Sequence, residues 1–121
     1  MIVDAHHHFW NPARIPQGWM SAEHAAIDRA FEPPDLRPLL GACGVDMTVL
    51  VQSASEDRDS DYMFELVDDV PWVGAVTAWC RLDDLDAARA RLDALAAHPK
   101  LRAIRHLIHQ EDDRHWILRE G

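Results

Sequence analysis

Short segments that predict strands alternate along this sequence with segments whose apolar residues recur at helical spacing. The predicted strands cover residues 2–8, 47–52, 72–79 and 101–108, of which 47–52 and 72–79 are largely apolar, and the helical patterns cover residues 36–43, 62–67 and 85–96. A strand that is apolar throughout is typical of a sheet covered on both faces. Strands that alternate with helices in this way predict parallel βα units. The predicted fold class is therefore α/β, with one sheet of about four parallel strands.

One long segment interrupts this regular pattern. Residues 11–34 contain several prolines and predict an irregular loop, with a turn of helix at 22–29. Asp35 is then the candidate N-cap of the first helix, which Gly44 ends. Loops of this length are usually functional, so this one is expected to contribute to a site.

A parallel sheet of this size fits two architectures, an open doubly wound layer or an arc of a (β/α)₈ barrel. The length of 121 residues favours the open layer, because a complete barrel typically needs about 250 residues. The motifs favour the barrel. An open nucleotide-binding sheet usually has a glycine-rich phosphate loop after its first strand, and this sequence has none there. Residues that bind metals or polar groups stand instead near the ends of the predicted strands, where barrels carry their chemistry; they are His6, His8, Gln52, Arg105 and His106.

Three consecutive histidines end the first predicted strand. Because side chains alternate between the faces of a strand, His6 and His8 share one face and His7 points away from it. Cα atoms about 6 to 7 Å apart allow both imidazoles to reach one divalent cation. Asp4 lies on the same face and is placed to orient an imidazole or to fix the strand end. The alternative is a histidine pair that is partly exposed or satisfied within the core.

Composition excludes two classes of partner. The net charge of −9 argues against nucleic acid, which requires clustered Lys and Arg. No apolar run approaches the about 18 residues of a membrane-spanning helix, and the N-terminus lacks the pattern of a secretory signal. We therefore expect a cytoplasmic protein without a membrane partner.

Several motifs together resemble one family. Residues 4–10, DAHHHFW, resemble the DAHxHxW opening of the amidohydrolase-related proteins (amidohydrolase family 2), which are metal-dependent hydrolases of the barrel type. The continuation FWNP, at residues 9–12, is similar to the branch that contains sugar-lactone and dicarboxylate-lactone hydrolases. Residues 44–52 resemble the second helix and strand of the family. Residues 101–106 resemble its RGIRH strand, with Ala103 in place of the usual glycine. The resemblance covers nearly the whole chain and implies that residues 1–121 are a single partial domain, the N-terminal half of such a barrel.

The resemblance implies that His6 and His8 bind a divalent metal, with zinc as the expected ion. In family members that work without a metal, the same pair helps to position the substrate. His7 is not expected to be a ligand.

Substrate-binding residues are expected at the same end of the sheet. Arg105 is suited to hold a substrate carboxylate or lactone oxygen through two hydrogen bonds, with a surface salt bridge as the alternative. Gln52 is placed either to bind a sugar hydroxyl or to cap the following loop. Trp10 and Trp19 are candidates for an apolar wall against a sugar ring. His106 is the weaker candidate, because its parity on the predicted strand is opposite to that of Arg105.

The reaction implied by the resemblance is attack of water on a lactone carbonyl, with a carboxylate from the eighth strand as proton acceptor. That catalytic carboxylate lies outside this chain, as do the histidines of the fifth and sixth strands, and the sequence ends inside the helix expected after strand four. Half a barrel has two open edges. We therefore consider a truncated or incomplete sequence, a half-barrel that self-associates through these edges, or a rearranged open sheet.

Three functions remain open at this stage. The first is metal-assisted hydrolysis of a lactone, for which the isolated chain is expected to be inactive. The second is non-oxidative decarboxylation of an aromatic or enoic acid by a member of the same superfamily. The third is a non-catalytic fragment that associates through its open edges.

Overall fold

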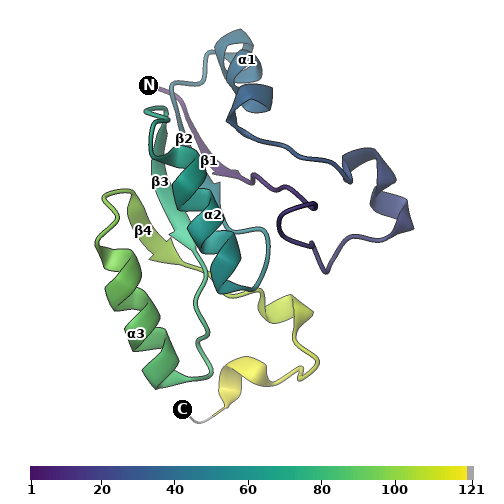
Figure 1. The fold of residues 1–121 in the computed structure, drawn as a ribbon, viewed down its shortest axis with the longest axis vertical. Coiled ribbons are helices and arrows are strands. Elements are labelled where there is room, and N and C mark those ends of the chain that lie inside the picture. Colours follow the sequence, from purple (N-terminus) through teal and green to yellow (C-terminus); the bar gives the residue numbers. More distant parts are fainter. Residues whose placement is uncertain (120–121) are drawn as a thin grey trace.

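The computed structural model describes residues 1–119 and contains one four-stranded sheet (Figure 1). The strands are β1 (Val3–His7), β2 (Met47–Val51), β3 (Val73–Ala78) and β4 (Leu101–Ile104). The helices are α1 (Pro33–Cys43), α2 (Asp57–Val67) and α3 (Leu85–Ala96), with short 3₁₀ helices η1 (Ala22–Ile27), η2 (Ile108–Gln110) and η3 (Trp116–Leu118). Every neighbouring pair of strands is parallel, which confirms the predicted α/β class.

The order of the strands distinguishes an arc of a barrel from a doubly wound layer. The sheet runs β1-β2-β3-β4, in the order of the chain and without a reversal, whereas a doubly wound sheet changes direction at a switch point. The helices also share one face of the sheet. Leu36 of α1, Met63 of α2 and Leu95 of α3 all pack in one core cluster with Leu50 of β2 and Val76 of β3. Parallel strands in chain order with helices on one face form an arc of a (β/α)₈ barrel.

The first helix begins earlier than the sequence predicts. Its N-cap is Glu32, and Pro33 and Pro34 occupy its first positions. Proline suits these positions because the first N–H groups of a helix have no partner within it. Asp35 is therefore not the N-cap; it lies one turn inside the helix, where its side chain accepts a hydrogen bond from the Glu32 N–H at 2.9 Å. Gly44 ends the helix with a φ of 67°, a conformation that glycine adopts without steric cost.

Two further boundaries differ from the prediction. Helix α2 begins at Asp57 rather than at residue 62, and β4 ends at Ile104 rather than at residue 108. Arg105 still donates its backbone N–H to Ala78 O at 2.9 Å, so pairing with β3 continues one residue past the strand. The helix expected after β4 is absent from the described residues, which form only η2 and η3 there. The chain is expected to end inside that helix, and its last residues, Glu120 and Gly121, lie outside the described residues.

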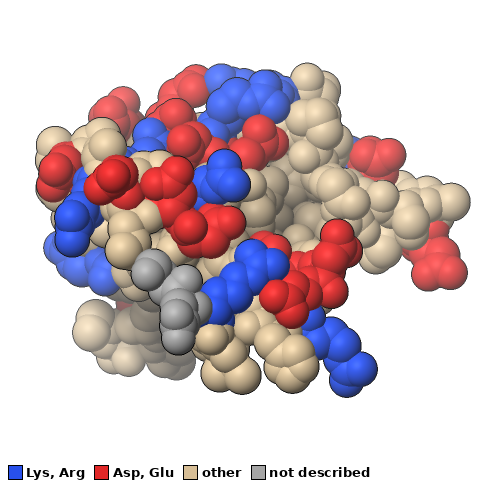
Figure 2. Space-filling model, turned by 90° about the horizontal axis from the view of Figure 1, so that it is seen from below, with Lys and Arg blue, Asp and Glu red and all other residues tan. Residues whose placement is uncertain are grey.

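Charged residues of both signs are mixed on the surface. Figure 2 shows Lys and Arg interspersed with Asp and Glu, around a hollow of uncharged residues. None of the helices within residues 1–119 is long and apolar enough to cross a membrane.

His7 lies on the helix-covered side of β1. Its Nε2 is 2.8 Å from the Thr48 hydroxyl, and its ring packs edge-on against Phe9, with centroids 4.7 Å apart. Burial lowers the pKa of His7 from 6.5 to about 4. The neutral imidazole therefore serves as a packing residue at neutral pH, as the alternation of side chains along the strand predicts.

The pKa of His7 predicts a pH dependence of stability. Because the pKa is lower in the folded than in the unfolded chain, the unfolded chain binds more protons between these two values. The free energy of unfolding should therefore decrease as the pH falls from 6.5 towards about 4. The expected loss is about 2 kcal/mol, allowing for partial exposure to solvent.

Urea unfolding at a series of pH values, with a metal chelator present, measures this effect. His7→Gln keeps a polar partner for Thr48 but does not titrate, and it should flatten the pH profile. His115→Gln changes an exposed histidine and should leave the profile unchanged. An equal slope in wild type and His7→Gln would contradict the assignment.

Candidate active site

A cavity of about 450 Å³ lies beyond the carboxyl ends of β1, β2 and β4. The residues that line it come from the ends of these strands, from the loop between β1 and α1, and from η2. They are His8, Trp10, Trp19, His24, Gln52, Ser53, Arg105, Leu107, His109 and Gln110. Several residues selected from the sequence therefore meet at one place, and the loop expected to be functional forms part of its wall.

The rings of His6 and His8 lie close together at the carboxyl end of β1. Their centroids are 4.9 Å apart and their planes are inclined at 67°. His8 lines the cavity, whereas His6 is exposed and does not. Asp4 makes no hydrogen bond to either imidazole within residues 1–119; its carboxylate accepts a hydrogen bond from the backbone N–H of His6 at 3.1 Å. Of the two roles considered for Asp4, the structure shows the one that fixes the strand end.

His8 has the protonation state that a metal ligand needs. Its Nδ1 is 2.8 Å from Val51 O, and a carbonyl can only accept, so Nδ1 carries the hydrogen and Nε2 keeps its lone pair. Burial also lowers the pKa of His8, which favours the neutral ring. A histidine whose other nitrogen donates to a backbone carbonyl is the usual arrangement of a metal ligand.

The donor atoms of this chain fit part of a metal site. Residues 1–119 contain no group of three or more His, Cys, Asp or Glu side chains arranged to hold a metal ion. His6 and His8 offer two imidazole nitrogens side by side, which is the type of donor that zinc prefers, although tight sites use three or four protein ligands. The pair is therefore suited to supply part of a coordination sphere.

Gln52 and Arg105 form the polar wall of the cavity. Gln52 is fully buried, and its Oε1 accepts a hydrogen bond from Arg105 Nη1 at 3.3 Å. Its Nε2 has no hydrogen-bond partner among the described residues. Since buried polar groups are rarely left without a partner, this amide is suited to donate to an oxygen of a ligand.

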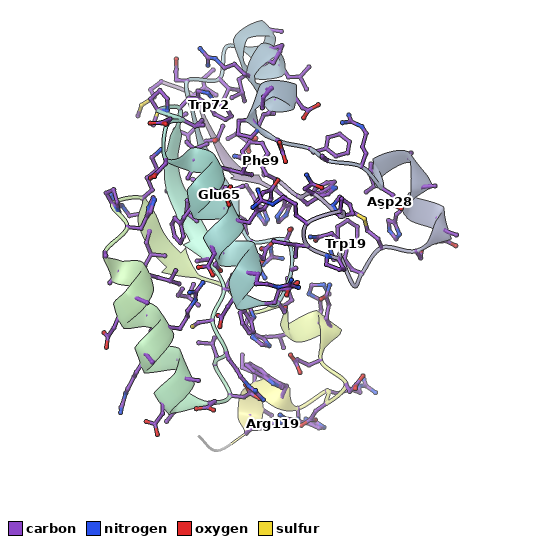
Figure 3. The ribbon with its side chains drawn as sticks, viewed as in Figure 1. Phe9, Trp19, Asp28, Glu65, Trp72 and Arg119 are labelled. Atoms are coloured by element: carbon purple, nitrogen blue, oxygen red, sulfur yellow. The ribbon has the colours of Figure 1, made fainter. Side chains whose placement is uncertain are left out.

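Trp10 and Trp19 form an aromatic wall on the loop side. Their rings meet edge to face, with centroids 5.9 Å apart, and Figure 3 shows Trp19 in the loop that extends from the sheet. The Trp10 indole N–H donates to Ile27 O and the Trp19 N–H donates to Ser53 O. Because both N–H groups are satisfied within the protein, the indoles offer apolar ring surface to a ligand.

His106 lies outside this cavity. Its Nε2 is 2.7 Å from Glu111 Oε1, and its ring stacks on Trp116 with centroids 4.1 Å apart. His106 therefore packs against the C-terminal segment, through Glu111 and Trp116, and is separated from the other candidate residues. A strand that continued to residue 108 would place Arg105 and His106 on opposite faces. This alternation does not apply, because β4 ends at Ile104.

Half of the lining residues were not predicted from the sequence. The missed residues are His24, Ser53, Leu107, His109 and Gln110. They lie on loops and 3₁₀ turns, whose direction no hydrophobic periodicity predicts. His24 alone had a local signal, because it follows Ser21 by three residues, the spacing of a capping box.

The loop after β2 is fixed by a buried carboxylate. Asp59, which is fully buried in α2, accepts hydrogen bonds from the Ser53 N–H at 2.9 Å and the Ser53 hydroxyl at 2.8 Å. Burial raises the pKa of Asp59. This pair holds Ser53, and with it the carbonyl that accepts from Trp19, at the edge of the cavity.

Comparison with known proteins agrees with the motifs and the geometry. The amidohydrolase family profile matches residues 3–120, nearly the whole sequence. The chain belongs to the amidohydrolase family. It is 39% identical over 115 residues to an L-fucono-1,5-lactonase from Burkholderia ambifaria, an alignment that covers 95% of this chain and 39% of that protein.

Solved amidohydrolases share the fold. Crystal structures of an amidohydrolase from Burkholderia multivorans, one with bound HEPES and one with bound zinc, match with TM-scores of 0.85 and 0.80 at 28% identity. The matches cover 98% of this chain and 41% and 42% of those chains. The chain thus spans about two fifths of the length of these amidohydrolases, and its sheet is a partial (β/α)₈ barrel.

Removal of the Asp59 carboxylate should destabilise the amidohydrolase chain. Asp59→Ala leaves the N–H of Ser53 without its partner, and we expect a loss of about 1 to 3 kcal/mol in the free energy of unfolding. Urea denaturation measures this loss. Asp93→Ala makes the same change on an exposed position of α3 and should stay within about 0.5 kcal/mol of wild type. Equal stability of the two variants would show that the pair does not anchor the loop.

Proposed function

We propose that this amidohydrolase acts on a sugar lactone, which it opens by metal-assisted attack of water. The observation that carries the proposal is the cavity at the carboxyl end of the sheet, where His8, Gln52 and Arg105 meet an aromatic wall. The relative named L-fucono-1,5-lactonase supports the choice of a lactone.

His6 and His8 are the proposed ligands of a divalent ion, with zinc as the expected species. The zinc-bound structure of the related amidohydrolase supports this choice. Such an ion polarises a carbonyl and lowers the pKa of bound water. His8 is held for this role by its hydrogen bond to Val51 O, and the proton acceptor for the attacking water is not assigned to a residue of this chain.

The charge of the cavity supports a neutral, hydroxylated ring. Arg105 is the one Arg or Lys among the described lining residues. A dicarboxylate lactone would bring carboxylates that favour additional cations, whereas one guanidinium and a free amide donor suit the ring and hydroxyl oxygens of a sugar lactone. Trp10 and Trp19 supply apolar surface for the carbon face of the ring. Small molecules of this class are the proposed partners.

Replacement of the first-strand histidines tests the function. Because the chain spans 39% of the lactonase, the enzyme to assay is a chimera in which this chain replaces the matched part of that relative. We expect the chimera to hydrolyse an aldono-1,5-lactone. A pH indicator measures the protons that this hydrolysis releases. The double variant His6→Ala and His8→Ala should fall to the spontaneous rate, since the metal ligands and the site around the carbonyl are lost.

The control for this assay is His115→Ala, which removes an exposed imidazole and should retain full activity. Retention of lactone hydrolysis by the double variant would refute the assignment of His6 and His8. Release of carbon dioxide from an aromatic or enoic acid, without lactone hydrolysis, would instead identify the chimera as a decarboxylase.

The isolated 121-residue chain is proposed to self-associate through its sheet edges. Within residues 1–119, β1 and β4 each pair on one side only, and Ile2, just before β1, and Val3, its first residue, remain 58% and 45% exposed. The two edges run parallel, so β4 of one copy can pair with β1 of a second. Sedimentation velocity should show species above the monomer mass of 13.8 kDa that increase with concentration. A proline at Val3 should reduce association, and a monomer at all concentrations would contradict the proposal.

A further inference from the structure

His24 is part of the wall of the cavity, but none of the roles described above is assigned to it. It lies in η1, within the loop between β1 and α1, and it lines the same cavity as Gln52 and Arg105. Its ring meets Trp19 edge to face, with centroids 5.4 Å apart and planes inclined at 89°. The aromatic wall and this imidazole therefore form one continuous surface.

Ser21 determines which nitrogen of His24 carries the hydrogen. The backbone N–H of Ser21 donates to His24 Nδ1 at 3.0 Å, and the Ser21 hydroxyl lies 3.0 Å from the same atom. An amide N–H cannot accept, so Nδ1 must be the unprotonated nitrogen. In a neutral imidazole the hydrogen then resides on Nε2. Within residues 1–119, Nε2 of His24 makes no hydrogen bond, which leaves this donor available to a ligand.

The loop that carries His24 is tied to the rest of the structure. Trp10 and Phe31 form an antiparallel bridge, with hydrogen bonds of 3.1 and 2.8 Å between their backbones. The Trp10 indole also donates to Ile27 O at the end of η1. These contacts hold η1 beside the cavity before any ligand arrives, which lowers the entropic cost of using a loop residue for binding.

We propose that His24 is a substrate-binding residue that donates a hydrogen bond from Nε2 to a ring hydroxyl of the sugar lactone. The inference rests on the proposed function, because it takes the ligand class from it. His24 Nε2, Gln52 Nε2 and the Arg105 guanidinium are donors from three separate elements of the chain. Such a set matches a ring that carries oxygens around its rim. In this arrangement the carbonyl of the lactone lies near His6 and His8. His24 donates to a ring hydroxyl and so contributes to substrate specificity.

The protonation state can be observed in the unmodified chain without a ligand. A long-range ¹H–¹⁵N correlation spectrum, recorded at a pH where His24 is neutral, should show Nε2 protonated and Nδ1 unprotonated. The opposite tautomer would overturn the proposal, because Nε2 would then have no hydrogen to donate.

Binding of a non-hydrolysable probe to the chimera of the activity assay tests the contact itself, and wild type here denotes the chimera with His24 unchanged. An aldono-1,5-lactam keeps the hydroxyls of the substrate, whereas δ-valerolactam has the same ring without them. We expect His24→Asn to bind the aldonolactam about tenfold more weakly than wild type, as for loss of one hydrogen bond to a ligand. Its affinity for δ-valerolactam should not change. Asparagine can still accept from Ser21 but is too short to reach the ligand.

His24→Gln and His115→Asn complete the set. Glutamine places an amide donor close to the position of Nε2 and should restore affinity to within about threefold of wild type. His115→Asn makes the same change as His24→Asn on an exposed histidine outside the cavity and should leave both affinities unchanged. Thermal unfolding of each variant verifies that the fold is retained.

The outcomes separate the two proposals. If wild type binds the aldonolactam and His24→Asn binds it equally well, His24 does not contact the ligand and the sugar-lactone proposal stands. If wild type binds neither lactam, the ligand class is wrong and the assignment of His24 fails with it. Tighter binding of δ-valerolactam than of the aldonolactam would likewise overturn both.

Discussion

The parallel pairing of β1 with β2 is the constraint on which the candidate site depends. Pairing brings His7 opposite Leu50 and leaves consecutive histidines on opposite sides of the strand. β2 then orients each of two rings: Thr48 binds the His7 imidazole and Val51 O binds Nδ1 of His8. A shift of one residue in this register would exchange the two faces. It would place His7 at the cavity and bury the proposed ligands His6 and His8 in the core.

The loop after β1 supplies the second half of the site. It leaves the sheet at Phe9, which is 2% exposed and packs edge-on against Trp72 (Figure 3). From this buried anchor the chain passes outward and returns through the bridge of Trp10 with Phe31. Trp19 connects the outer part of this loop to the loop after β2 by its hydrogen bond to Ser53 O. An irregular segment is thus positioned by contacts at both ends and in the middle, as a binding surface on a loop requires.

The sequence predicted the sheet well, because apolar β-branched runs and helical periodicity report burial directly. It also predicted that His6 and His8 would share a face, which follows from strand geometry alone. It failed where local chemistry competes with pattern. The start of α1 was misplaced because a Pro-Pro pair favours the first helical turn more strongly than Asp35 favours the N-cap. His106 was the weaker candidate from its parity, and it lies outside the cavity, where its ring stacks on Trp116. His24 was missed because only the folded loop brings it to the cavity.

The distribution of polar groups in the cavity bears on how such a site discriminates among ring substrates. A buried amide with a free N–H penalises any ligand that leaves it without an acceptor, and the penalty exceeds what the hydrogen bond itself contributes. Gln52 imposes this condition next to Arg105, while the indoles of Trp10 and Trp19 have no free N–H and select for shape. An apolar ring would satisfy the indoles but leave the Gln52 amide unpaired. A linear polyol would satisfy the amide but leave much of the aromatic surface uncovered, whereas the proposed hydroxylated ring meets both conditions.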